Sequence, residues 1–546
     1  MKRISYLLGI TLLAGPTPTV AASFSHRPYL QDEGVDVLNR TVARQLVDRD
    51  LLANPYDTAV IGHVDVYDRF PYVESRWFQV VSDSDWNRLL VGEVGGDLRA
   101  EDAAASAVGA LDQPRGLAVD EHGTVYVADS GNHRVVVFDS HTEFGSISLT
   151  PRYVIDGLSR PYDVAFSDGG TPFVAGDDRL YVADTGSNRV VAFALESHRA
   201  VPRAEVGELG SGAGHFAGPF AIAVGHENGV NTSDVYVADA HNGRIVHLND
   251  RGDHLEWSSA QRHEVGLVTS LDTDHWGHVY AAAPASGQVV KFANNLETLA
   301  RVETGLDRPR AFHVPFVTRT DHRNGSVERR GQGAGVLVEQ WTEATGIRVL
   351  QIGADVADLH LKSEAGVRAD FLLTDRAAVA GSVLDDRGNV VRTQEAGTIN
   401  AGRTSLEFTE RDLVGLPAGE YTLRVSAESG YEESPGGAAE GTFQWNGSSL
   451  ESLDRVALLG GTPNPFQTAT TLRFAVPANA PSHSVAVFDI SGRLVRQLAN
   501  GAVAAGMHSV TWNGRDTAGR EVSAGIYFVQ LTVGDAVDTH KVVHFR

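Results

Sequence analysis

An internal repeat limits what this chain can fold into more than any other feature of its sequence. The segment LDQPRGLAVDEHGTVYVADSGNHRVVVFD, at residues 111–139, recurs in altered form at residues 158–193 and 216–248. Weaker copies begin at residues 267 and 306, and residues 80–91 match the second half of the unit. One such unit cannot bury both of its faces, so the copies are expected to pack against one another.

Each copy contains short, β-branched apolar runs bounded by Gly, Asp and Asn, which favours strands over helices. The landmark residues Asp83, Asp129, Asp184 and Asp239 lie 46, 55 and 55 residues apart. This spacing suits four short strands with loops of variable length. With the upstream copy included, the pattern predicts an all-β fold with a six-bladed β-propeller over residues 63–353. It does not place the inner strand of the first blade.

The copies resemble the NHL repeat, whose signature is Pro-x-Gly-apolar-Ala-Val-Asp followed by VYVADSGNxRV. Enzymes on this scaffold, such as amidating lyases and streptogramin-lyase-like proteins, use metal-binding or acid–base histidines. The histidines here share no repeat position and no metal-ligand spacing, and only His313 falls on a predicted inner strand. No catalytic residue is therefore predicted. The histidines considered are His122, His215, His241, His275, His278 and His313.

Four aspartates of the repeat each precede an arginine by five residues. A cluster of acidic groups for catalysis or metal binding is one interpretation. The alternative, which we favour, is that the Asp caps a tight hairpin while the Arg pairs with it. In the fifth copy both positions change together, to Ala283 and Gln288, as a structural pair would. The pairs are Asp83–Arg88, Asp129–Arg134, Asp184–Arg189 and Asp239–Arg244.

The position after the conserved blade proline differs in chemistry from copy to copy. It is occupied by Arg115, Tyr162, Phe220 and Arg310, and we align Val268 with it in the copy that lacks Pro. Two arginines and two aromatic residues could bind an anionic or sugar-like ligand, so these four are the predicted ligand-binding residues. The alternative is that they pack between blades or face water.

After residue 353 the repeat stops and two related β units follow. VLDDRGNVVR and LPAGEYTLRV, from residues 383 and 416, are echoed by VFDISGRLVR and VSAGIYFVQL from residues 487 and 522. The near-constant offsets, 104 and 106 residues, predict two successive Ig-like β-sandwiches. We place a spacer sandwich at residues 354–446, a linker at 447–457 and a C-terminal sandwich at 458–546.

The C-terminal unit resembles the type A sorting domain of type IX secretion cargo and the related flagellar-hook-capping Ig-like domain. The resemblance rests on TPNPF at residues 462–466, on VFDISGRLVR, on the segment from residue 506, and on the terminal HKVVHFR. It implies recognition by outer-membrane export machinery, with the last strand the segment that is read. An Ig-like module without a sorting role is the alternative. The motif residues are Asn464, Pro465, Phe466, Gly492, Trp512, Gly514, Gly525, Tyr527 and Lys541.

The N-terminus has the pattern of a signal peptide. Lys2 and Arg3 precede an apolar run, and small residues end at position 22, so residues 1–22 are expected to be cleaved. The apolar run is too short to span a bilayer, and no later segment is long enough. In the extension at residues 23–62, the stretch LNRTVARQLVDRDLLANP is expected to form an amphipathic helix.

Composition excludes several classes of function. The chain of 546 residues contains no cysteine, so thiol catalysis, thiolate metal sites and disulfides are ruled out. A net charge of −23 argues against nucleic acid as the partner.

We therefore expect a secreted or surface-displayed binding protein, with a protein, peptide or glycan as ligand and no cofactor. The alternative is a secreted lyase or hydrolase with Ca or Zn in the central pore.

Overall fold

The computed structural model describes most of the chain from residue 55 to residue 545 and three short segments before it. The predicted signal peptide lies outside the described residues. The described residues are 31–32, 35–36, 45–47 and 55–545, except 68–71, 94–97, 102–107, 144–145, 175, 228–229, 263–265, 304–307, 315, 322–325, 332–333, 341–344, 352, 364–365, 431–435, 448–456, 477–481 and 503–505.

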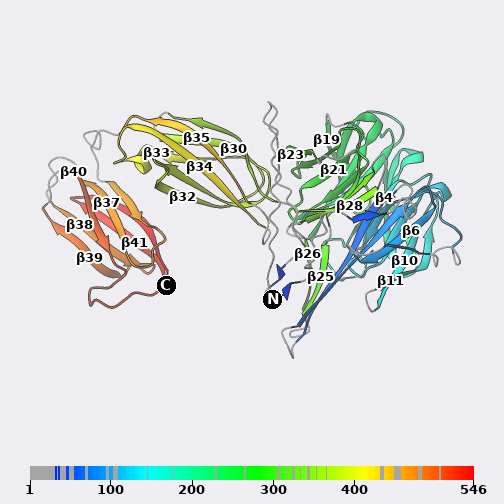
Figure 1. The fold of residues 1–546 in the computed structure, drawn as a ribbon, viewed down its shortest axis with the longest axis horizontal. Coiled ribbons are helices and arrows are strands. Elements are labelled where there is room, and N and C mark those ends of the chain that lie inside the picture. The colour runs from blue at the N-terminus through cyan, green and yellow to red at the C-terminus, as the bar shows by residue number, and fades with distance from the viewer. Residues whose placement is uncertain are drawn as a thin grey trace.

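The repeat region forms six sheets among the described residues, which we number as blades 1 to 6 (Figure 1). Blade 1 contains β4 (Pro55–Tyr67), β5 (Tyr72–Asp83), β6 (Arg88–Glu93) and β7 (Arg99–Ala100). Blade 2 contains β8 (Pro114–Val119), β9 (Val125–Asp129), β10 (Arg134–Glu143) and β11 (Ser146–Ile155). Blade 3 contains β12 (Asp163–Ser167), β13 (Arg179–Asp184), β14 (Arg189–Glu196) and β15 (Arg199–Val206). Blade 4 contains β16 (Pro219–Glu227), β17 (Val230–Asp239), β18 (Arg244–Asp250) and β19 (Leu255–Arg262). Blade 5 contains β20 (Ser270–Thr273), β21 (Val279–Ala283), β22 (Gln288–Phe292) and β23 (Thr298–Glu303). Blade 6 contains β24 (Pro309–His313), β27 (Ala334–Gln340), β28 (Thr345–Gln351) and β3 (Gln45–Val47). The all-β prediction is thereby confirmed.

The inner strands β4, β8, β12, β16, β20 and β24 contact one another in this order, and β24 contacts β4. The ring is therefore closed. Side chains on the two faces of each blade enter two different cores, each shared with a neighbouring blade. In one of them, Ala118 and Tyr126 of blade 2 pack with Val164 and Leu180 of blade 3. Stacking of this kind buries both faces of a sheet that could not bury them alone.

Two strand exchanges join the first and last blades. The N-terminal strand β3 pairs antiparallel with β28, with Leu46 opposite Gly346, and so becomes the outermost strand of blade 6. In return, β25 (Phe316–Asp321) and β26 (Ser326–Gly331), which follow β24 in the chain, extend the sheet of blade 1. Strand β25 pairs parallel with the second half of β4, with Val317 opposite Gly62.

The ring closure corrects two expectations from the sequence. The inner strand of the first blade is β4, so the propeller begins before residue 63, with β3 and Pro55–Tyr67. The segment expected to be an amphipathic helix forms a strand at Gln45–Val47, where pairing with β28 outweighs the helical pattern. The rest of that segment before residue 55 lies outside the described residues.

The two C-terminal sandwiches have the same topology. The first pairs the sheet β29 (Val356–Lys362), β30 (Gly366–Leu373), β33 (Gly402–Thr409) with the sheet β32 (Val390–Ile399), β31 (Ala377–Leu384), β34 (Gly419–Ser429), β35 (Gly437–Trp445). The second pairs β36 (Ala457–Thr462), β37 (Thr470–Val476), β40 (Gly506–Trp512) with β39 (Leu494–Gly501), β38 (His483–Asp489), β41 (Gly525–Val533), β42 (Ala536–His544). The orders match strand for strand, as the repeated sequence motifs predict.

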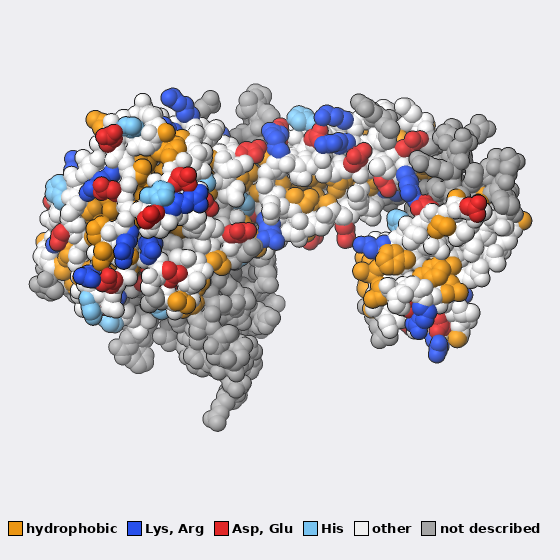
Figure 2. Space-filling model, turned by 180° about the vertical axis from the view of Figure 1, so that it is seen from behind, with side chains coloured by type: hydrophobic (Ala, Val, Ile, Leu, Met, Phe, Trp, Pro, Cys, Tyr) orange, Lys and Arg blue, Asp and Glu red, His pale blue; other side chains and the backbone are white. Residues whose placement is uncertain are grey.

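The sandwiches differ in what they expose. Figure 2 shows hydrophobic side chains gathered on the C-terminal sandwich, where Ile490, Leu494, Phe528 and Val537 are exposed. In the middle sandwich the apolar side chains are largely buried between its two sheets.

We predict that Leu46→Pro destabilises the propeller, because proline removes a backbone donor from the pairing of β3 with β28. The expected loss is about 1–3 kcal/mol of unfolding free energy, measured by chemical denaturation. The control is Val35→Pro in β2 (Val35–Asp36), which pairs only with β1 (Gln31–Asp32). Equal stability of Leu46→Pro and the unmodified chain would contradict closure through β3.

Candidate functional site

The landmark aspartates lie in structural ion pairs inside their own blades. Asp239 is fully buried; its Oδ1 accepts a hydrogen bond from the backbone N–H of Ala217 at 2.7 Å. Its Oδ2 accepts from Asn242 Nδ2 at 2.8 Å and from Arg244 Nε at 2.7 Å. Arg244 also donates to the carbonyl of Ser211 in the connection that enters the blade. The same pair joins Asp129 to Arg134 at 2.7 Å, Asp184 to Arg189 at 2.8 Å and Asp83 to Arg88 at 3.4 Å.

A second set of carboxylates links neighbouring blades around the axis. Asp57 of blade 1 accepts the backbone N–H of Leu117 in blade 2, at 2.8 Å. Asp163 of blade 3 accepts that of Ile222 in blade 4, at 2.9 Å. In blade 5 the hydroxyl of Ser270 takes this place and accepts the N–H of Phe312 at 3.3 Å.

The equivalent positions in blades 2, 4 and 6 are small: Gly116, Ala221 and Ala311. Space explains the first of these, because a Cβ on Gly116 would lie 2.0 Å from Asp163 Oδ1. Acceptor and small residue therefore alternate around the ring. The sequence analysis missed this pattern, although Pro-Tyr-Asp occurs both at residues 55–57 and at residues 161–163.

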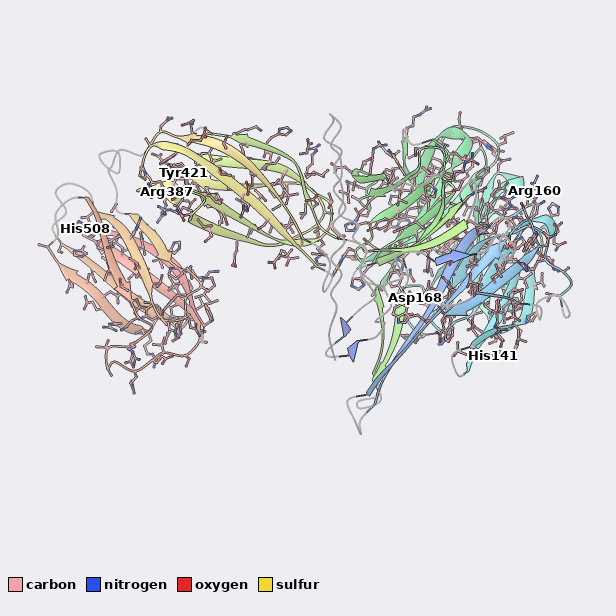
Figure 3. All side chains as sticks on the ribbon, in the orientation of Figure 1. His141, Arg160, Asp168, Arg387, Tyr421 and His508 are labelled. Carbon is pink, nitrogen blue, oxygen red and sulfur yellow. The ribbon has the colours of Figure 1, made fainter. Side chains whose placement is uncertain are left out.

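Inside the ring of inner strands lies a cavity of about 330 Å³. Its polar lining includes Asp57, Asp163 and Asp272 from three alternating blades, with His313 from blade 6. Apolar side chains such as Val60, Phe78 and Ile222 also line it, and no lysine or arginine lines it among the described residues. The lining extends to residues that follow the inner strands, namely Asp120, Glu121, His122, His226 and Phe316. Figure 3 labels Arg160 and Asp168, which flank β12 and so mark the two faces of the propeller.

Burial and mutual repulsion shift the acidity of the axial carboxylates. Burial raises the pKa of Asp57 to about 6, against hydrogen bonds from the backbone that lower it. Burial also raises the pKa of Asp163, and the negative charge of Asp57 adds to this effect. Asp272 Oδ2 lies 2.8 Å from His313 Nδ1 and accepts the N–H of Val314 at the same distance. Asp57 and Asp163 are thus costly to keep charged unless a positive charge joins them.

The four predicted ligand-binding residues lie at the opposite face, where inner strands begin, and three of them contact one another. The guanidinium carbon of Arg115 lies 3.9 Å from the ring centroid of Tyr162, which stacks on Phe220 at 4.6 Å. Tyr56, which the sequence analysis did not single out, lies 4.9 Å from the same guanidinium. Burial lowers the pKa of Arg310, and the charge of Arg115 lowers it further, so the two arginines are near each other.

Hydrogen bonding corrects the alignment of the copy that lacks proline. The backbone N–H of Tyr162 donates to the carbonyl of Ala183, and that of Thr269 donates to the equivalent Ala282. Thr269, not Val268, therefore occupies the position of Tyr162. Val268 is fully buried instead.

Asp274, His278 and Asp375 are the only group of three or more metal-ligating side chains within 4.8 Å of one another among the described residues. Lys291 enters the same cluster, with Nζ 2.6 Å from Asp375 Oδ2. Its ammonium group supplies the positive charge that a metal ion would otherwise supply. The cluster therefore suits an ion pair better than a metal site.

In the C-terminal sandwich the motif residues hold the last strand in place. Asn464 Oδ1 accepts the N–H of Val543 at 2.7 Å, and Phe466 exchanges backbone hydrogen bonds with residues 543 and 545. Trp512 is fully buried between Phe466 and Tyr527, at centroid distances of 5.3 and 5.1 Å. The other motif residues are Pro465 beside this contact, Gly492 and Gly514 at positive φ of 78° and 66°, Gly525 at the start of β41, and exposed Lys541 on β42.

Two family matches agree with the fold. The NHL repeat matches residues 111–138, within blade 2, and the FlgD Ig-like domain matches residues 464–536, within the C-terminal sandwich. These confirm the NHL repeat and the Ig-like domain. No curated protein matches the chain.

Several solved structures are similar at low identity. Virginiamycin B lyase from Staphylococcus aureus is 12% identical, covers 61% of this chain and 95% of its own, and has a TM-score of 0.31. The calcium-binding protein regucalcin from Agrobacterium tumefaciens is 13% identical (57% and 94% covered, TM-score 0.34). A putative gluconolactonase is 14% identical (55% and 94% covered, TM-score 0.35). At these TM-scores we draw no conclusion from them. Within the described residues, no helix has the length and apolarity to cross a membrane.

We predict that Asp239→Ala lowers the unfolding free energy by about 3–5 kcal/mol, because it leaves the partly buried Arg244 without its partner. Asp253→Ala is the control, since that carboxylate is exposed and paired only with its neighbour His254; we expect a change within about 0.5 kcal/mol. Chemical denaturation of both variants measures the difference. Similar losses for the two would contradict a structural role for the landmark pairs.

Proposed function

We propose that the propeller is a ligand-binding module and that its ligand is a small organic cation held in the axial cavity. One observation carries this proposal: Asp57, Asp163 and Asp272 line a single cavity, and among the residues that the structure describes its lining includes no lysine or arginine. Burial, with a smaller contribution from mutual repulsion, raises the pKa of Asp57 and Asp163, and a bound positive charge would offset both effects. The cavity volume lies at the lower end of the range for small-molecule sites.

The spacing of the carboxylates favours an organic cation over a bare metal ion. The three axial aspartates are not among the side chains whose ligand atoms lie within 4.8 Å of one another in the described part of the chain. A cation with an amine or guanidinium group and an apolar body could instead contact both the carboxylates and the apolar walls.

The Arg115–Tyr162–Phe220 contacts at the other face support a different class of ligand. Their side chains, with Arg310 nearby, present positive charge and aromatic rings, which suit an anionic or sugar-like ligand. They already pack against one another, however, and none of them lines the axial cavity. We therefore place the ligand in the axial cavity and use the Arg115 cluster as the comparison.

A second function, acid–base catalysis, is favoured by the pairing of Asp272 with His313 at 2.8 Å. An imidazole oriented by a carboxylate is the arrangement of a general base, and Asp57 with a pKa of about 6 is suited to proton transfer. The two functions differ in whether the ligand is recovered unchanged. Mass spectrometry of a ligand incubated with the protein distinguishes them.

We predict that cationic members of a small-molecule panel bind and that their acetylated, uncharged counterparts do not. The affinity is expected to rise as the pH is raised through about 6, because Asp57 gains its charge in that range. Isothermal titration calorimetry in buffers of different ionisation enthalpy should show that binding releases protons.

The matched variants are Ala165→Phe, which fills the cavity from its wall, and Arg115→Ala at the other face. Ala165→Phe is expected to abolish binding while Arg115→Ala leaves it within about twofold. Loss of binding in Arg115→Ala with retained binding in Ala165→Phe would contradict the axial site and indicate that the ligand binds at the Arg115 cluster.

The C-terminal sandwich supports a proposal about export. We infer that the chain is a secreted or surface protein carrying an N-terminal signal peptide and a type IX sorting domain. The support is the resemblance of the motif order from Asn464 to Lys541, together with the hydrogen bonds by which Asn464 and Phe466 hold β42.

We predict that deleting residues 458–546 leaves the protein in the periplasm, whereas the full chain reaches the outer surface or medium. Fractionation and immunoblotting in a host with this secretion system measure the outcome. A fusion of residues 1–22 to a periplasmic reporter is the control. Normal release of the truncated chain would rule out the sorting role.

A further inference from the structure

A buried charge network crosses the boundary between the propeller and the middle sandwich. Lys291 of β22 places its Nζ 2.6 Å from Asp375 Oδ2, in the segment between β30 and β31. The exposed fractions of the two side chains are 3% and 0%. An ion pair so fully removed from water is held in place by strong attraction, and removing one partner strands the other charge.

The network has further members, all from blade 5. Asp274 Oδ2 accepts from Tyr280 at 2.9 Å and lies 2.8 Å from His278 Nδ1. His278 Nδ1 is also 3.6 Å from Asp375 Oδ1, and Lys291 Nζ is 3.8 Å from Asp274 Oδ2. Two carboxylates, one imidazole and one ammonium group thus face one another in this buried cluster.

Apolar and stacking contacts surround the network. Leu299 of β23 packs with Ala357 and Leu372 of the sandwich in one buried cluster. The guanidinium of Arg376 lies 4.3 Å from the ring centroid of Trp276 in blade 5. Figure 1 shows β30 of the sandwich adjoining the part of the propeller that carries β23.

The contact also shapes the surroundings of the axial cavity. A cleft of about 600 Å³ is lined by both domains, by Arg376 and Asn400 of the sandwich and by Asp234 and His278 of the propeller. His226 lines both this cleft and the axial cavity. The sandwich therefore lies beside a residue that also lines the axial cavity.

We propose that the Lys291–Asp375 network locks the middle sandwich to blade 5, so that the propeller and this sandwich open and unfold as one unit. The sandwich is then fixed beside His226, a residue of the cavity lining, and is not a free spacer. This inference does not depend on ligand binding and goes beyond the proposed function.

A double-mutant cycle on the full chain tests the lock. Lys291→Met and Asp375→Leu alone each remove the nearest opposite charge from a buried group, and we expect proteolytic cleavage between the two domains to accelerate by about 100-fold or more. The double variant Lys291→Met/Asp375→Leu replaces the ion pair with apolar side chains, and its cleavage rate should return to within about tenfold of the unmodified chain. Additive effects of the two substitutions would overturn the proposal.

The control applies the same substitution to an exposed pair. Lys362 lies 2.8 Å from Asp370 on the sandwich surface, and its side chain is 69% exposed. Lys362→Met should change the cleavage rate by less than about threefold. If the single variants do not fold, calorimetry of the unmodified chain still decides. One transition for the propeller and middle sandwich together is expected, and two separate transitions would contradict the lock.

Discussion

Closure of the ring is the interaction on which the rest of the propeller depends. Every blade is a sheet with two apolar faces, and only a ring covers both faces of all of them. Blade 1 and blade 6 meet through β24 and β4, and they also exchange strands: β3 enters blade 6, while β25 and β26 enter blade 1. About 300 residues separate β3 from β28, so their pairing carries a loss of chain entropy from closing a long loop. The packing of the complete ring is what offsets this loss.

The same hydrogen bonds that join blades also create the chemistry of the axis. Asp57 and Asp163 are placed where they are to accept backbone N–H groups from the next blade. The same placement also gives the axial cavity buried negative charge, because few polar groups other than backbone N–H donors reach these two carboxylates. Stability and binding are therefore coupled in these residues. A substitution that removes the charge also removes an inter-blade hydrogen bond, which is why a cavity-filling change at Ala165 separates the two effects better.

Local features were predictable from the sequence, and long-range ones were not. Repeated strand patterns and turn residues located β9, β10 and their equivalents, because these are neighbours in the chain. Strand β3 was predicted to be part of a helix. Its partner strand lies far along the chain, and three residues are too few to show the alternation of apolar and polar residues that marks a strand. Among the candidate site residues, Arg115, Tyr162 and Phe220 were correctly expected to share one face. Asp57 and Asp163 were not predicted, because Pro-Tyr-Asp occurs in only two copies and the aspartate is not shared by the whole repeat. The Lys291–Asp375 contact joins two domains, and nothing in either segment indicates its partner.

The alternation of acceptor and small residues around the axis has a consequence for how such a chain can change. Asp57, Asp163 and Ser270 each need a small neighbour in the following blade, and Gly116 shows how little space there is beside Asp163. Removing or inserting one blade would place two acceptor residues, or two small residues, side by side. The first would crowd the acceptors and the second would leave N–H groups without acceptors. The structural period of this ring is therefore two blades and not the single repeat.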